Sequence, residues 1–220
     1  MHVAANVSSR VMLAGTVLIL VVEHALRNLL VPLIPGEGTV QVALGTEWLL
    51  FVVLLGVWVP RLERLTWRSV GIGPWRRRYL WLGVGWFVAA TVASAVVGLL
   101  LRVAGLDSLA DLQPKLTGYA WPTLLALGLT GAVVEEVLYR GYLIERVIAL
   151  SGRVWVAAAI SWVAFTAVHL GFFGPGPTLN VAVLSAAFVW LYVRERSIWP
   201  VVLMHGLNSL FAYLLVPLLT

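Results

Sequence analysis

The stretch Gly131-Ala132-Val133-Val134-Glu135-Glu136-Val137-Leu138-Tyr139-Arg140 decides the fold of this chain. It places two adjacent carboxylates and one arginine inside an apolar run that is typical of a membrane helix. An ionised group within a bilayer is costly unless it is paired or reaches water. We therefore expect these three charged residues to belong to a buried site.

The spacing of the three residues predicts different roles for the two acids. On a helix, Glu136 and Arg140 are four residues apart with the acid on the N-terminal side, the favourable order for an ion pair. Glu135 is turned about 100° away from that pair. We expect Arg140 to neutralise Glu136, which leaves Glu135 available as a general base. The alternative is a purely structural ion pair with a spare acid at a helix end.

The composition predicts an all-α fold, a polytopic transmembrane helix bundle. Hydrophobic residues make up 61% of the 220 residues and charged residues only 11%, and the mean hydropathy is +0.95. We expect residues 1–220 to form a single membrane domain. The absence of cysteine excludes disulfides, thiolate metal ligands and a cysteine nucleophile. The net charge of +5 does not indicate nucleic-acid binding, because the basic residues lie in short loops, where they set membrane orientation.

About seven apolar runs have the length of membrane spans. They cover roughly residues 11–31, 48–59 with residues added from 42 onward, 79–103, 119–145, 154–170, 178–193 and 198–216. With an N-terminus inside the cell, every basic loop falls on one side, which predicts a multi-pass protein of the cell membrane. Lys115 is the only lysine beside many arginines. This usage is typical of GC-rich genomes and favours a prokaryotic cytoplasmic membrane.

The segments between these runs carry the remaining polar features. Residues 32–47 contain two acids and no basic residue, which predicts an exterior loop. The prolines and glycines of residues 171–177 predict a break after the fifth span. Glu145, Arg146 and Arg153 mark a cytoplasmic boundary. Glu23, His24 and Arg27 of the first span are interpreted as a self-neutralised structural group.

Residues 61–78 are predicted to form an interfacial basic segment on the cytoplasmic side. Apolar anchors alternate there with six arginines, Arg61, Arg64, Arg68, Arg76, Arg77 and Arg78. We interpret the segment as a topology signal that contacts the membrane surface. A specific site for an anionic lipid head group is the alternative.

The late spans contain further polar side chains that lipid alone cannot satisfy. Phe165 and His169 are four residues apart, so the aromatic ring can orient the imidazole. His205 and Asn208 are three residues apart and share a helix face. Each polar group in lipid needs a partner. We therefore expect these residues and Glu135 to line one cavity, as helix-borne sites commonly do.

These residues form three motifs that resemble those of a known family. They read Glu135-Glu136-Val-Leu-Tyr-Arg140, Phe165-Thr-Ala-Val-His169 and His205-Gly-Leu-Asn208. Together they resemble the CPBP family of intramembrane proteases, which includes the CAAX prenyl endopeptidases and bacteriocin-processing or immunity proteins. The resemblance implies a catalytic core over residues 118–215. The family pattern places its last polar residue four positions after the histidine, so Ser209 is an alternative to Asn208 as the fourth site residue.

The resemblance implies an endopeptidase that hydrolyses a peptide bond of a membrane-associated peptide or protein. Glu135 and His169 would hold and deprotonate the attacking water, and His205 and Asn208 would stabilise the oxyanion. Glu136 and Arg140 would hold the helix and tune Glu135. We expect no cofactor, since HExxH spacing is absent and an amide beside the second histidine fits an oxyanion hole. The alternative is a zinc ion bound by Glu135, His169 and His205.

Two other function classes compete with the protease hypothesis. The first is a non-enzymatic membrane scaffold or bacteriocin-immunity factor that binds a peptide in the same groove. The second is a proton-coupled transporter that uses Glu135 and the histidines as a relay. The intact motifs argue against the first, and the absence of an internal repeat argues against the second. The substrate itself is not readable from the sequence.

Overall fold

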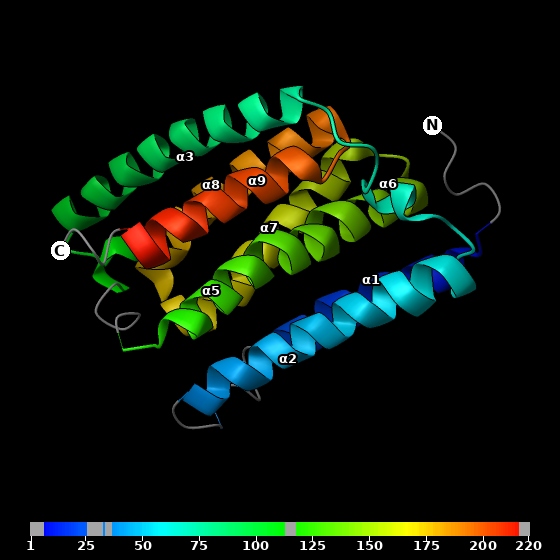
Figure 1. Ribbon diagram of the computed structural model, residues 1–220, viewed down its shortest axis with the longest axis horizontal. Helices are drawn as coiled ribbons and strands as arrows, with labels where there is room; N and C mark the ends of the chain where they lie inside the picture. Colours follow the sequence, from blue (N-terminus) through cyan, green and yellow to red (C-terminus); the bar gives the residue numbers. More distant parts are fainter. Residues whose placement is uncertain (1–6, 26–32, 34–36, 113–117, 216–220) are drawn as a thin grey trace.

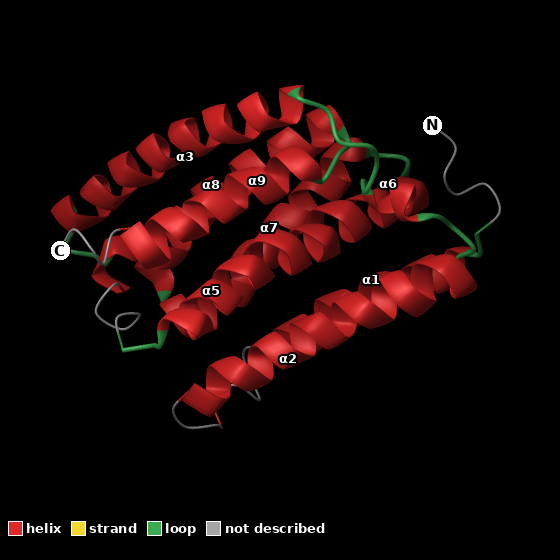
Figure 2. Ribbon diagram, viewed as in Figure 1, coloured by secondary structure: helices red, strands yellow, loops and turns green. Residues whose placement is uncertain are grey.

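The computed structural model describes residues 7–25, 33, 37–112 and 118–215. The secondary structure of these residues is helical, with no strand, and it includes seven continuous helical runs (Figures 1 and 2). The runs are α1 (Ser9–Ala25); α2 (Glu37–Val53) with the π-helix η3 (Leu54–Leu62); α3 (Arg78–Val103); α5 (Trp121–Leu129) with the π-helix η6 (Thr130–Ile144) and α6 (Glu145–Ser151); α7 (Val154–Phe173); α8 (Pro175–Glu195); and α9 (Trp199–Leu210) with the π-helix η7 (Phe211–Leu215).

Five of these runs are long and apolar enough to cross a membrane. They cover Val40–Leu62, Arg78–Val103, Trp121–Ser151, Val154–Phe173 and Pro175–Glu195, and Ser9–Val22 is a shorter apolar helix. Their surfaces fit lipid as well. Helix α3 exposes a row of large apolar side chains that includes Trp81, Val92, Leu99 and Leu100, a pattern that a water-soluble monomer rarely tolerates. The chain therefore has the features of a multi-pass membrane protein.

The sequence argument located most helices correctly but placed several of their ends wrongly. Residues 37–47 are not part of an exterior loop, because α2 begins at Glu37. Helix α7 continues through the predicted break to Phe173, and only Gly174 separates it from α8. The predicted boundary at Glu145 and Arg146 is helical, since α6 ends only at Ser151. In the predicted group of the first span, Arg27 and the Glu23 side chain lie outside the described residues.

The long run that carries the two carboxylates lies at the centre of the bundle. Figure 1 shows α3 and α2 at opposite edges, with α5, α7, α8 and α9 between them. The segment η6 packs against α2, α7, α8 and α9, and fourteen of its fifteen residues, all except Val133, are buried. The 3₁₀ turn η4 (Trp67–Val70) approaches η6 closely at Gly141, where an added Cβ would lie 2.5 Å from the Val70 carbonyl oxygen.

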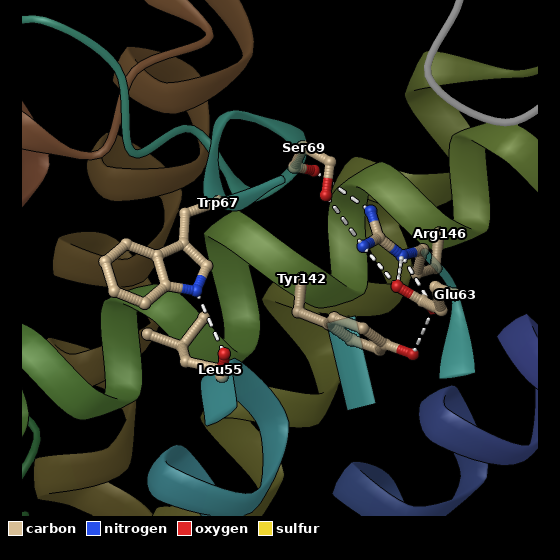
Figure 3. Close-up of polar contacts among 6 residues, drawn as sticks. All are labelled: Leu55, Glu63, Trp67, Ser69, Tyr142 and Arg146. Carbon is tan, nitrogen blue, oxygen red and sulfur yellow. Dashed lines mark hydrogen bonds and ion pairs between the residues drawn. The ribbon is translucent and has the colours of Figure 1, made fainter. Parts of the chain in front are cut away.

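A buried ion pair ties the basic segment to the central run, and Figure 3 shows it. The Arg146 guanidinium donates to both carboxylate oxygens of Glu63, from Nε at 3.0 Å and from Nη2 at 2.5 Å. It also donates to the backbone oxygen and the hydroxyl of Ser69 at 2.9 and 3.0 Å. Tyr142 donates to the same carboxylate at 2.8 Å. Arg146 is therefore a buried structural residue and not a surface topology signal.

A second contact stabilises the turn between η3 and η4. Helix η3 contains Pro60, which has no N–H to offer the Leu55 carbonyl five residues earlier. The Trp67 indole donates to that oxygen at 2.9 Å (Figure 3). The indole thus replaces a missing backbone donor, while part of its ring stays exposed at the surface.

We expect Glu63→Gln to destabilise the protein by about 3–5 kcal/mol, because it leaves the buried Arg146 guanidinium without its counter-charge. Thermal unfolding of the purified protein in detergent measures this loss. Arg61→Gln, which changes an exposed residue of the same segment, should leave the unfolding temperature nearly unchanged. Replacing both Glu63 and Arg146 by methionine should recover much of the loss. An undiminished unfolding temperature in Glu63→Gln would contradict the structural role of the pair.

Candidate active site

The predicted ion pair is present at the centre of the bundle, on a π-helix where the sequence argument assumed an α-helix. Arg140 Nη1 lies 3.2 Å from Glu136 Oε1, and both side chains are fully buried. Arg140 Nη2 also donates to the Ser185 hydroxyl of α8 at 2.9 Å. The guanidinium carbon lies 3.9 Å from the centre of the Phe165 ring, a cation–π arrangement. Arg140 therefore joins η6, α7 and α8 in one contact.

His205 makes a contact that the sequence argument did not foresee. Its Nδ1 atom lies 2.7 Å from Glu136 Oε1, so the ring donates a proton to the carboxylate that also binds Arg140. The imidazole stacks on Phe188, with ring centres 4.7 Å apart and 18° between the planes. Together these contacts fix the orientation of the imidazole. Its other nitrogen, Nε2, then faces away from Glu136.

His169 is oriented by its own helix. Its Nδ1 atom lies 2.7 Å from the backbone oxygen of Phe165, and a carbonyl oxygen can only accept. Nδ1 therefore carries a proton. The ring centre lies 4.6 Å from that of Phe165 and 5.4 Å from that of Phe173. The prediction that Phe165 orients His169 is confirmed, and its carbonyl group contributes as well as its ring.

One cavity of about 190 Å³ collects the predicted polar side chains. Glu135 comes from η6, His169 from α7, and His205 and Asn208 from α9. Ser209 lines the same cavity. Most of the remaining wall is apolar or aromatic, which is typical of a ligand site with a few convergent polar groups. The Glu136–Arg140 pair is outside the lining and supports the cavity from behind.

Gly131 allows two of these groups to approach each other. A Cβ atom added to it would lie 3.0 Å from His205 Nε2 and 3.7 Å from Glu135 Oε2. The imidazole nitrogen and the carboxylate oxygen thus lie over the same backbone position. A residue with a side chain at position 131 would crowd His205 Nε2, while its distance to the Glu135 oxygen would be an ordinary contact.

The sequence argument missed Glu47, which lies on α2 and lines the same cavity. Its residue is 4% exposed. The residues Val40, Ala43, Leu44 and Glu47 have the spacing of one helix face, and all four line the cavity. That pattern was readable in the sequence. The prolines, glycines and acids of residues 32–47 predict a loop instead, and for residues 37–47 that prediction is wrong.

The donor set does not fit the alternative zinc site. Within the described ranges, no three histidine or acidic side chains converge closely enough to bind a metal ion. We therefore derive no step through a metal ion.

The fold and the cavity are those of a helical membrane protein with a polar site inside the helix bundle. The family model for Rce1-like type II CAAX prenyl endopeptidases matches residues 117–211. This segment is therefore a domain of that family, and the family implies a protease with a protein substrate. No curated protein and no solved structure gives a significant match to the chain.

The two adjacent acids should differ in their effect on stability. Glu136→Gln removes the counter-charge of the fully buried Arg140, and we expect a loss of about 3–5 kcal/mol. Glu135→Gln changes a residue of the cavity wall, where substitutions are often neutral or stabilising, and we expect a change within about 1 kcal/mol. Parallel thermal unfolding of the two variants measures the difference. Equal losses would show that Glu135 is as structural as Glu136.

Proposed function

We propose that the protein is an intramembrane endopeptidase that hydrolyses a peptide bond of a membrane-associated peptide or protein. The observation that carries the proposal is the single cavity that Glu135, His169, His205 and Asn208 line together. It combines two hydrogen-bond acceptors with two groups that can donate. Hydrolysis of an amide needs both kinds, one to activate water and one to stabilise the oxyanion.

Glu135 and His169 are suited to activating the water. The Glu135 carboxylate accepts protons, and the contact of His169 Nδ1 with the Phe165 carbonyl makes Nε2 the acceptor atom of the neutral ring. A water molecule that donates one hydrogen to each has its lone pair directed at the substrate. Glu135 takes the proton as the oxygen attacks the carbonyl carbon. It then delivers that proton to the leaving amine when the C–N bond breaks, so the products are a carboxylic acid and an amine.

His205 and Asn208 are suited to stabilising the oxyanion. With Nδ1 donating to Glu136, His205 donates from Nε2 when both of its ring nitrogens carry a proton. The Asn208 amide supplies the second donor. Ser209 is less suited, because it packs against α5, where a Cβ on Gly128 would lie 3.3 Å from its own Cβ. Arg140 and Glu136 act as positioning residues behind these groups.

The same proposal covers the placement of the chain in the membrane. We infer that all seven helical runs cross, that residues 1–220 form one membrane domain, and that residues 118–215 are its catalytic core. The basic segment 61–78 then lies on the cytoplasmic side with the N-terminus, in a prokaryotic cytoplasmic membrane. The exposed Trp67 and Trp75 support this as interfacial anchors.

Glu135→Gln should abolish proteolysis, because the amide cannot accept the proton of the attacking water. We would compare membrane proteomes of cells that carry the wild type, Glu135→Gln or Asp107→Asn, and search for new peptide termini. Asp107 is an exposed acid outside the cavity lining, so its variant should keep the wild-type termini. Addition of a chelator to the purified enzyme should leave the rate of cleavage unchanged. Full biological activity of Glu135→Gln would instead favour a scaffold or immunity factor. Substrate flux in proteoliposomes would favour a transporter.

Gly131→Ala should lower activity at least tenfold while the fold is retained. Alanine is the better helix former, but its Cβ would meet His205 Nε2 at 3.0 Å, so the imidazole would have to shift by a few tenths of an ångström while Glu136 holds its Nδ1 atom. The kcat for a cleaved peptide and the unfolding temperature are measured together. Gly45→Ala, at a position of α2 with open space around it, is the matched control. Wild-type kcat in Gly131→Ala would contradict the proposed place of His205 in the reaction.

A further inference from the structure

The basic segment carries positive charge that the protein itself does not neutralise. Residues 61–78 contain six arginines and one acid, Glu63. Glu63 is buried in the ion pair with Arg146, and Arg78 is paired with Glu195 at the end of α8. The other arginines are exposed, and none of them forms an ion pair with an acid of the described residues: Arg61, Arg64, Arg68, Arg76 and Arg77.

The two ends of the bundle differ in how their charges are balanced. At the end that holds the basic segment, Glu145 of α6 is also engaged, because it is paired with Arg196 and accepts from another side chain. At the opposite end of α3, Arg102 is paired with Asp111, and Asp107 is a further exposed acid. The excess of positive charge is therefore confined to one end, where it is available to an anionic partner.

Arg64 holds its place at a cost in backbone conformation. Its φ is 56°, in the left-handed region that favours glycine over residues with a side chain. In the described part of the chain only one other residue with a side chain has a positive φ, Arg196, and its guanidinium is paired with Glu145. The exposed guanidinium of Arg64 has no such partner in the protein. A strained residue without an internal contact points to an external one.

The position of the basic segment identifies that partner as lipid. It joins two helices that can cross a membrane, Val40–Leu62 and Arg78–Val103, and Figure 1 shows it crossing one end of the bundle between α2 and α3. It therefore lies where the hydrocarbon of the bilayer ends and the head groups begin. Trp67 and Trp75 are 54% and 51% exposed beside the arginines, and tryptophan is enriched at this level of a membrane. The anions closest to the arginines are then lipid phosphates.

The folded protein holds the basic segment firmly in place. The Ile198 N–H donates to the Gly71 carbonyl at 3.0 Å, and the Trp199 indole donates to the Gly73 carbonyl at 2.6 Å. Ser69 accepts from the buried Arg146 through its backbone oxygen and its hydroxyl. These contacts join the arginines to α9 and to the central run, so the cationic surface exists in this form only when the bundle is folded. A ligand that binds the folded form alone raises its stability.

We propose that the exposed arginines of the basic segment form a binding surface for the head groups of anionic phospholipids, and that such lipids stabilise the folded protein through it. The surface consists of Arg61, Arg64, Arg68, Arg76 and Arg77, with Trp67 and Trp75 at the level of the head groups. Juxtamembrane clusters of arginine attract anionic lipids over zwitterionic ones. The proposal gives the segment a ligand in addition to its role in topology, and it holds whether or not the protein cleaves peptides.

Thermal unfolding of the purified full-length protein in nanodiscs tests the proposal. The nanodiscs contain phosphatidylcholine alone or phosphatidylcholine mixed with phosphatidylglycerol. Phosphatidylglycerol should raise the unfolding temperature of the wild type by about 5 °C. The triple variant Arg64→Gln, Arg76→Gln and Arg77→Gln should unfold near the wild-type temperature in phosphatidylcholine and lose most of the shift. Arg102→Gln, which changes an exposed arginine at the opposite end of α3, should retain it.

Three results would overturn the proposal. The first is an equal unfolding temperature of the wild type in both kinds of nanodisc, and the second is a full shift in the triple variant. The third is an equal shift when inorganic phosphate is added to phosphatidylcholine nanodiscs, because it would assign the surface to a free anion instead of a lipid. If the triple variant does not fold, the wild type in high salt decides. Salt screens exposed charges, so the shift should shrink there, and an unchanged shift would contradict binding by the arginines.

Discussion

Arg140 is the residue on which the interior of this protein depends. A fully buried guanidinium is stable only when a counter-charge neutralises it and its N–H groups have hydrogen-bond acceptors. The partners of Arg140 come from different helices: Glu136 on η6, Ser185 on α8 and the Phe165 ring on α7. His205 of α9 joins the same carboxylate. One cation thus fixes the relative positions of four helical segments. The cavity lies beside this contact: Phe165 and His205 belong both to the network and to the cavity lining, whereas Arg140 and Glu136 do not line it.

The π-helical form of η6 fits this arrangement. A π-helix is rare and occurs frequently at functional sites, and here it runs over fifteen residues, Thr130–Ile144. It is held from outside as well as by its own bonds. Ser161 donates to the Tyr139 carbonyl at 2.9 Å, and the buried pair of Glu63 and Arg146 holds the helix just after η6 ends. The N-terminal half therefore helps to hold residues 117–211, the segment that matches the family model.

Sequence reasoning succeeded where a single physical signal dominated. Apolar runs located the helices, and the four-residue spacing predicted the contact of Glu136 with Arg140, which survives the change to a π-helix. The four polar groups that were expected to share a cavity do so, while their roles stay proposals. Reasoning failed where burial overrides the usual meaning of a charge. Arg146 was taken as a surface residue, although Glu63, far away in sequence, makes its burial possible. The contact of His205 with Glu136 also depends on helix offsets that no local pattern records.

Glu47 illustrates both a success and a failure of prediction from the sequence. Its position in a segment rich in proline and glycine predicts a loop. Its spacing from Val40, Ala43 and Leu44 predicts the inner face of a helix, and this second prediction is correct. A buried acid is expensive in lipid, and a chain with so few charges places them where they act. The proposed site residues all lie within the segment that matches the family, whereas the part of the cavity wall that holds Glu47 comes from α2.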